Sequence, residues 1–398
     1  MRPGSIGSFA PYSSRWPIGA WFEKQKIVAS DAEASDRFGL GVAMSGDGLT
    51  TVVGATREDP SSVSDAGAAY VFQRSGEVWS QTFKLTASTP QATAYFGEYV
   101  AINQDGTVIA VGAPFEDGSF LNSGAVYIYR WNGTSWDETR LVASPEKASA
   151  TFGRGVALSA SGNRLLVGAV GDTSNNGAMF VFDYAGGSWT QTDRIAPYTG
   201  AYKFANKIAM SPDGKTLFGT RVIGIGEINV FRQVGGVWTK VQNFSQRSNA
   251  QLASSFNGSV LASGDESTSR VYVYDELTPN TWTLRTTLNS TPSISGAIFG
   301  ASVAISYDGN ALLVGAREST GGVGSVKTGC AYGFVYSPLT STWRQTPVML
   351  TDPRPESLAQ VGAAISCSSD GYYVNVGAYL ENAGGLTDSG ASYIYKAS

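Results

Sequence analysis

One pattern of about fifty residues recurs seven times along the chain. Each copy contains an apolar segment, an Asp-Gly turn or a variant of it, a second apolar segment that in most copies ends in Gly-Ala, and an aromatic segment. All copies but the last continue with a segment that begins with Trp. The turn glycines lie 44 to 62 residues apart, at Gly48, Gly106, Gly162, Gly214, Gly258, Gly309 and Gly371. Units of this kind cannot bury a hydrophobic face alone, so they must stack on their neighbours.

The residue types within each copy predict four β-strands. An Asp-Gly or Asn-Gly pair between two apolar segments is a strong hairpin signal. The first segment has a small residue at its centre, such as Ala43 in the first copy and Ala101 in the second. Small side chains suit strands that crowd around a common axis. We therefore predict an all-β fold, a single seven-bladed β-propeller of four-stranded antiparallel blades.

The N-terminal part of the chain supplies the strand that the last copy lacks. The last copy ends soon after Tyr395 without a Trp-led segment, whereas residues 21–30 match the Trp-led segment 79–88 of the first copy. We predict that residues 21–30 form the outer strand of the last blade, so that the ring closes and leaves no open edge. Residues 1–20 are then an N-terminal arm, and residues 21–398 form one propeller.

Composition excludes several classes of function. The chain has no histidine, so it cannot build a Ser-His-Asp site, and the commonest zinc ligand is missing. Only 15% of the residues are charged and the net charge is −4, which argues against a nucleic-acid surface. We find no apolar run long enough to insert into a membrane and no signal-peptide pattern near Met1.

The order Phe-Gly, Val-Ala, Asp-Gly and Val-Gly-Ala resembles the FG-GAP repeats of integrin alpha-subunit propellers and their microbial and viral relatives. This succession of motifs begins, for example, at Phe38, Phe96 and Phe152. The resemblance implies an adhesion or protein-binding module. It also implies calcium bound in a D-x-D-x-D-G loop between the first two strands.

The corresponding loops of this chain depart from the calcium pattern. Loops such as 45–48 and 103–106 hold one acid each, whereas calcium takes six to eight oxygen ligands, usually from several carboxylates. We therefore expect no cofactor and interpret the acids as turn formers. These acids are Asp47, Asp105, Asp213, Asp308 and Asp370.

The loops between the second and third strands carry the candidate site. They are long in the first, second, sixth and seventh copies, and loops held on a rigid scaffold commonly carry binding residues. We predict that they form a binding rim for a protein or glycan partner. The candidate residues are Arg57, Glu58, Asp59, Phe115, Glu116, Asp117, Phe120, Asp172, Arg317, Glu318, Tyr379, Leu380 and Glu381.

Three interpretations of these loops remain open. The favoured one is a non-enzymatic binding or structural module in a virion or another extracellular assembly. A second is a calcium-dependent adhesin. A third is a carbohydrate-active enzyme in which two carboxyl groups, for example Glu58 and Glu116, act as a catalytic pair. The plain alternative for any single acid is that it is a solvated loop residue.

Overall fold

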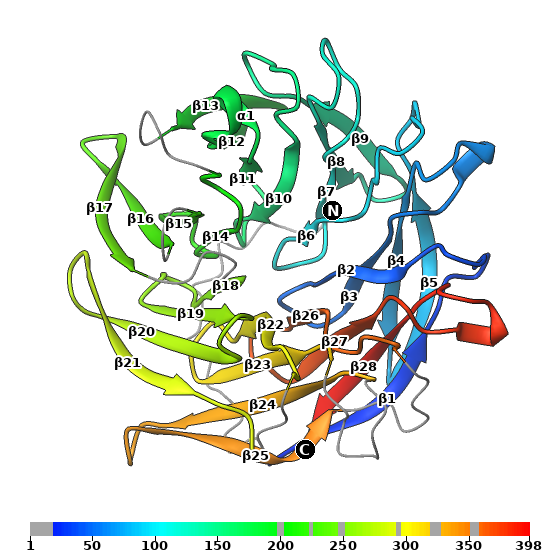
Figure 1. Cartoon of the computed structure of the whole chain (residues 1–398). Coiled ribbons are helices and arrows are strands. Elements are labelled where there is room, and N and C mark those ends of the chain that lie inside the picture. The colour runs from blue at the N-terminus through cyan, green and yellow to red at the C-terminus, as the bar shows by residue number, and fades with distance from the viewer. Residues whose placement is uncertain are drawn as a thin grey trace.

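Seven four-stranded antiparallel sheets surround a common axis in the computed structural model (Figure 1). The structure describes residues 19–196, 203–222, 226–245, 251–291, 296–318, 328–350 and 358–398. Most of the predicted N-terminal arm, residues 1–18, lies outside these ranges. The sheets confirm the predicted all-β, seven-bladed propeller. In the described residues, no helix is long and apolar enough to span a membrane.

The first three blades follow one another directly along the chain. Blade 1 consists of β2 (Phe38–Met44), β3 (Thr50–Ala55), β4 (Ala68–Ser75) and β5 (Val78–Leu85). Blade 2 consists of β6 (Val100–Ile102), β7 (Val108–Ala113), β8 (Ala125–Trp131) and β9 (Trp136–Leu141). Blade 3 consists of β10 (Phe152–Leu158), β11 (Arg164–Ala169), β12 (Ala178–Ala185) and β13 (Ser188–Ile195).

The remaining blades complete the ring. Blade 4 consists of β14 (Ile208–Met210), β15 (Thr216–Arg221), β16 (Glu227–Val234) and β17 (Val237–Ser245). Blade 5 consists of β18 (Gln251–Ser254), β19 (Val260–Asp265), β20 (Arg270–Thr278) and β21 (Thr281–Leu288). Blade 6 consists of β22 (Phe299–Ile305), β23 (Ala311–Ala316), β24 (Cys330–Ser337) and β25 (Thr342–Leu350). Blade 7 consists of β26 (Ala364–Cys367), β27 (Tyr373–Ala378), β28 (Ala391–Ala397) and β1 (Trp21–Ile27).

The described helices are all short and lie in the loops between second and third strands. They are η1 (Pro60–Ser62), α1 (Asp172–Asn175) and η2 (Ala383–Gly385). These loops therefore have local structure of their own in blades 1, 3 and 7.

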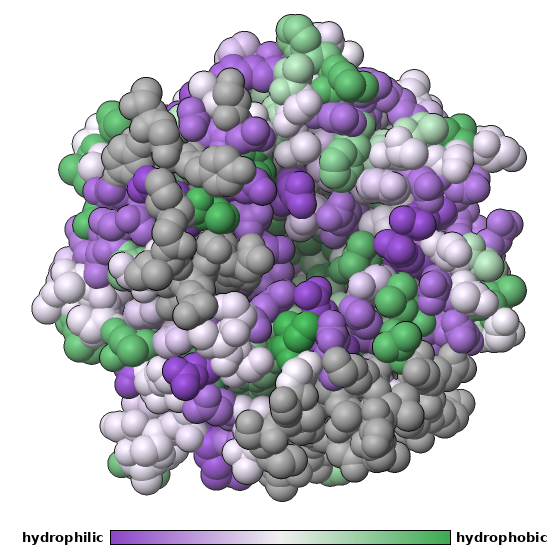
Figure 2. Space-filling model, viewed as in Figure 1, coloured by the Kyte–Doolittle hydropathy of each residue, from purple (hydrophilic) through white to green (hydrophobic). Residues whose placement is uncertain are grey.

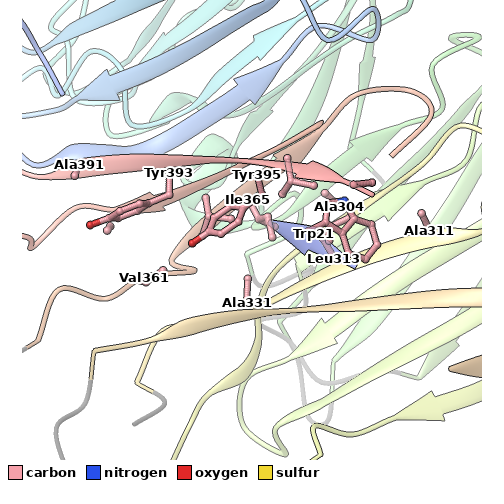
Figure 3. Packing of buried hydrophobic residues seen from close by; sticks show 14 of the residues in the cluster. Trp21, Ala304, Ala311, Leu313, Ala331, Val361, Ile365, Ala391, Tyr393 and Tyr395 are labelled. Atoms are coloured by element: carbon pink, nitrogen blue, oxygen red, sulfur yellow. The ribbon is translucent and has the colours of Figure 1, made fainter. Parts of the chain in front are cut away.

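The predicted N-terminal segment closes the ring through β1, the first strand of the described residues. β1 pairs with β28 in antiparallel register, from Trp21 opposite Ala397 to Ile27 opposite Ser392. Trp21 is fully buried and belongs to a hydrophobic cluster that also contains Ala304 and Leu313 of blade 6 (Figure 3). The N-terminal strand thus completes blade 7 and packs against its neighbour.

Two glycines explain why the Phe-Gly and Val-Gly-Ala motifs occur together. Gly97, after Phe96, has a φ of +97°, and its carbonyl oxygen lies against Gly54 of the preceding blade. A Cβ atom added to Gly54 would lie 1.9 Å from that oxygen. Neighbouring blades therefore approach backbone to backbone at this point, which only glycine permits.

At the opposite end of the axis, hydrogen bonds link the turns between first and second strands into a closed ring. Each turn donates a backbone N–H to a carbonyl oxygen of the next turn, at 2.6 to 3.1 Å. The acceptor carbonyls belong in turn to Gly46, Gln104, Ala160, Pro212, Phe256, Tyr307 and Ser369. The donor is the following aspartate in two turns, Asp213 in blade 4, where Pro212 has no N–H, and Asp47 in blade 1.

Candidate functional site

The long loops and the blade-to-blade connections share one face of the molecule, which we call the loop face. In blade 1 the backbone N–H groups of Thr93 and Phe96 donate to the carbonyl oxygens of Ser64 and Ala66, at 2.9 Å each. The connection that leaves the blade is thereby tied to the loop between β3 and β4. Figure 2 shows this face, with a hollow near the axis and hydrophilic residues beside it.

Four of the predicted rim acids are buried beneath this face. Each is the third residue after a Gly-Ala pair, and they are Glu58, Glu116, Asp172 and Glu381. In blade 1, Glu58 accepts hydrogen bonds from the Tyr70 hydroxyl at 3.2 Å and from Lys84 Nζ at 2.6 Å. The tyrosine lies on β4 and the lysine on β5, so the acid ties its loop to the two outer strands of its own blade.

The same arrangement recurs in three other blades. In blade 2, Glu116 accepts from the Tyr127 hydroxyl at 2.8 Å and from Arg140 Nε at 2.7 Å. In blade 3, where the tyrosine is replaced by Phe180, Asp172 pairs with Arg194 Nη2 at 2.6 Å and with Lys147 Nζ at 2.9 Å. In blade 7, Glu381 pairs with the Tyr393 hydroxyl and with Lys26 of the closing strand.

These contacts shift the pKa values of the participating groups. Burial favours the neutral form of Asp172, but hydrogen bonds from Arg194, Thr173 and Lys147 outweigh it and hold the pKa of this carboxyl below its usual value. Burial, followed by the charge of Glu116, raises the pKa of Tyr127, so that its hydroxyl stays a donor.

The burial of these four acids contradicts the alternative that they are solvated loop residues. Each carboxylate is buried because a cation from the outer strand neutralises it, and three of the four also receive a tyrosine hydroxyl. Glu58 and Glu116, suggested above as a catalytic pair, each belong to the ion pair of a separate blade.

The other candidate residues remain at the surface of the loop face. Asp59, Asp117 and Phe120 are exposed, and Phe120 keeps 49% of its surface accessible beside Leu121 at 66%. The half-buried members are Arg57, Phe115, Arg317, Glu318, Tyr379 and Leu380. The structure brings only some of these together, and it places Arg57 and Phe115 around one pocket.

This pocket, called here the blade 1–2 pocket, has a volume of about 230 Å³. Its lining residues are Arg37, Leu40, Thr56, Arg57, Tyr95, Glu98 and Phe115. The rings of Tyr95 and Phe115 meet edge to face, with centroids 5.6 Å apart. Arg57 Nε lies 3.9 Å from Asp65 Oδ1, and the Arg37 guanidinium forms no ion pair with any residue that the structure describes.

A second hollow adjoins it at the axis. This central cavity of about 190 Å³ is lined mostly by first strands, and it shares Leu40 and Glu98 with the blade 1–2 pocket. Burial raises the pKa of Glu98, while the charges of Arg154 and Lys207 oppose the increase. Burial also lowers the pKa of Lys207. Charged side chains from blades 2, 3 and 4 therefore interact with one another, and one of them, Glu98, lines the cavity.

Leu40, Glu98 and Arg154 were not among the predicted site residues, although the sequence contains a signal for them. In blades 1, 2, 3 and 6 the residue type that follows the Phe-Gly pair varies strongly, although the neighbouring positions repeat. The same holds after the equivalent pairs Phe204-Ala205 of blade 4 and Val361-Gly362 of blade 7. The residues there are Leu40, Glu98, Arg154, Asn206, Ala301 and Ala363. A variable position inside a constant repeat is a candidate for function, because the fold does not dictate its residue type.

Two more of the predicted residues lie in the loops of blades 6 and 7. Arg317 Nη2 pairs with Glu266 Oε2 of blade 5 at 3.0 Å. The Tyr379 hydroxyl donates to Gln360 Oε1 at 2.9 Å. Burial raises the pKa of Tyr379, and the charges of Arg317 and Arg37 oppose that increase. Arg317 and Tyr379 are therefore each held by a polar contact with another side chain.

The turns at the opposite face do not fit a calcium ion. Asp47 Oδ1 accepts hydrogen bonds from Ser45 Oγ at 2.5 Å and from the backbone N–H of Leu49 at 2.9 Å. Asp213, Asp308 and Asp370 make the same pair of contacts. Among the described residues, no three Asp, Glu or Cys side chains are grouped so that they could hold a metal ion.

Comparison with known proteins agrees with this architecture. A family model described as FG-GAP repeat matches residues 21–72, 79–129 and 136–182. The crystal structure of the Cps50 (Swd1) β-propeller domain of Myceliophteria thermophila is similar in fold, with a TM-score of 0.61 and 11% sequence identity. The similarity covers 95% of this chain and 100% of that one. The search of curated protein sequences found no match.

Proposed function

The protein is a seven-bladed propeller in which residues 21–72, 79–129 and 136–182 match FG-GAP repeats, and from this premise we propose that it is a non-enzymatic module that binds a protein or glycan partner on its loop face. The observation that carries the proposal is the blade 1–2 pocket. It combines two arginines with an aromatic pair, residue types that commonly anchor interfaces. Fold alone does not assign a function.

The surroundings of the pocket support a partner larger than a single small molecule. Phe120 and Leu121 are exposed on the neighbouring loop of blade 2, and Asp59 is exposed on the loop of blade 1. Exposed apolar side chains beside a polar pocket are common where a partner binds. In finer terms, we propose that the module acts within a larger assembly, either a viral particle or a complex outside the cell.

The non-enzymatic part of the proposal rests on the loop acids. Glycoside cleavage by a carboxylate pair needs two carboxyl groups that face the same sugar bond. Glu58 and Glu116 are instead buried and are each neutralised by a cation of their own blade.

Site-specific photo-crosslinking in the source cells tests the proposal. A photoreactive amino acid replaces Phe120 or Asp59 on the loop face. The matched control replaces Leu49, which is 44% exposed beside an Asp-Gly turn at the opposite face. We expect a discrete ultraviolet-dependent adduct from positions 120 and 59. Adducts that form equally well from position 49, or only from it, would contradict the loop-face assignment.

A further inference from the structure

The blade 1–2 pocket has a lining of mixed charge that restricts the chemistry of its ligand. Arg37 and Arg57 contribute two positive charges, and Glu98 contributes a carboxyl group. We propose that the pocket binds a sugar ring that carries a carboxylate, such as a uronic acid. This inference rests on the proposed function and names the ligand class of the same face.

The two arginines provide the site for the carboxylate. The Arg37 guanidinium has no ion-pair partner within the described ranges, and the nearest acid to Arg57 Nε is Asp65, at 3.9 Å. That separation is too long for a hydrogen bond, so the donors of Arg57 also remain available. A planar guanidinium can donate two parallel hydrogen bonds to one carboxylate.

The remaining residues favour a sugar over an acidic amino-acid side chain. A ligand that brought only a carboxylate would be repelled by Glu98 in its ionised form, whereas sugar hydroxyls can donate to that carboxyl group. The Thr56 hydroxyl also lines the pocket and has no hydrogen-bond partner in the part of the chain that the structure describes. Tyr95 and Phe115 add apolar surface of the kind that packs against a sugar ring.

The size of the pocket agrees with one sugar unit. Pockets for drug-sized ligands commonly measure about 300 to 1,000 Å³. The blade 1–2 pocket, at about 230 Å³, is smaller. It therefore suits a single ring at the end or side of a larger glycan.

Titration calorimetry and saturation-transfer NMR on the full chain test the inference. The probes are methyl glucuronide and methyl sialoside, which carry a carboxylate, and methyl glucoside, which is neutral. N-acetylglutamate amide represents an acidic side chain. We expect at least one carboxylated sugar to bind at least tenfold more tightly than both the glucoside and the glutamate derivative.

Substitutions locate the binding. Arg37→Gln and Arg57→Gln should each weaken binding of the carboxylated sugar at least tenfold. Arg344→Gln, which removes the same charge from an exposed position on β25, should leave the affinity unchanged. Melting temperatures measured on all three variants separate loss of binding from loss of folding.

The remaining outcomes distinguish this inference from the proposed function. Equal binding of glucoside and glucuronide, or tighter binding of the glutamate derivative, overturns the assignment of a carboxylated sugar. If neither carboxylated sugar binds while positions 120 and 59 still form adducts, this inference fails and the proposed function stands. If the adducts are absent as well, both fail.

Discussion

The indole Nε1 of Trp21 donates a hydrogen bond of 2.9 Å to the carbonyl oxygen of Gly371, and both groups are buried. The two residues are 350 positions apart in the chain. Gly371 belongs to the turn between β26 and β27, so the bond joins the outer strand of blade 7 to the turn after its inner strand. Ring closure therefore depends on contacts between segments that are about 350 residues apart in the sequence.

Replacing Trp21 with alanine should destabilise the ring strongly. The change removes a fully buried indole from the cluster shared by blades 6 and 7. We expect the free energy of unfolding to fall by about 3–5 kcal/mol, as measured by urea denaturation. The control is Phe22→Ala on the same strand. Phe22 is 50% exposed, so its removal should cost less than about 1 kcal/mol. Equal losses would contradict the role assigned to Trp21.

Gly333 on β24 should tolerate no side chain while Trp21 is present. A Cβ atom at this position would lie 2.2 Å from Trp21 Cζ3. We expect Gly333→Ala to lower the free energy of unfolding by about 1–3 kcal/mol through overpacking. When Trp21 is replaced by leucine, Gly333→Ala should lower the free energy of unfolding by less. A double-mutant cycle should then give a coupling energy of at least about 0.5 kcal/mol. Additive effects would show that the two residues do not share this space.

Removing Arg140 should destabilise the protein, because the buried Glu116 then lacks its cation. Arg140→Met leaves the Glu116 carboxylate with the Tyr127 hydroxyl but without its cation. Because the arginine side chain keeps 35% of its surface exposed, water compensates in part, and we expect a loss of about 1–3 kcal/mol at neutral pH.

The double variant Arg140→Met/Glu116→Gln provides the matched comparison. It removes the unpaired charge and should recover part of the lost stability in urea denaturation. Arg344→Met, at an exposed position of another outer strand, should have little effect. A double variant as unstable as the sum of its two single changes would refute the ion-pair interpretation.

Asp36 should make stability decrease as the pH rises. Burial, together with the nearby Glu58 carboxyl, raises the pKa of Asp36 from 3.8 to about 7, although a backbone hydrogen bond from Glu33 opposes the shift. Between these two pH values the folded state holds a proton that the unfolded state has released. The stabilisation from this group is therefore present below about pH 4 and is lost as the pH rises through 7.

Asp36→Asn should abolish this dependence. Asparagine keeps an acceptor for the Glu33 N–H, bonded at 2.6 Å, without placing a second negative charge beside Glu58. The melting temperature of the variant, compared with that of the parent protein at the same pH, should increase as the pH rises from 5 to 8. If the difference in melting temperature stays constant over this range, or grows toward acid pH, Asp36 is not the source of the pH dependence.

The blades and their closure could be predicted from sequence because their signals are local. An Asp-Gly pair specifies a turn through short-range hydrogen bonds, such as those of Asp47 with Ser45 and Leu49. The match between residues 21–30 and 79–88 identified the closing strand in the same way, since equivalent strands meet equivalent environments.

The candidate site was only partly predictable. Arg57 and Glu58 are adjacent in a loop, and a loop has no periodicity that tells which side chain turns inward. Glu58 is buried because Tyr70 and Lys84, on two different strands, converge on it. That convergence depends on the register of β4 and β5, which sequence alone did not establish.

The sequence by itself determined the number of blades, their turns and the strand that closes the ring, because each of these depends on contacts within one repeat or on similarity between repeats. Only the tertiary structure decided that Arg37 and Phe115, from neighbouring blades, line one pocket. The physical reason is the close packing of Gly54 against Gly97, which sets how near two blades approach and therefore which loop side chains meet across the boundary between them.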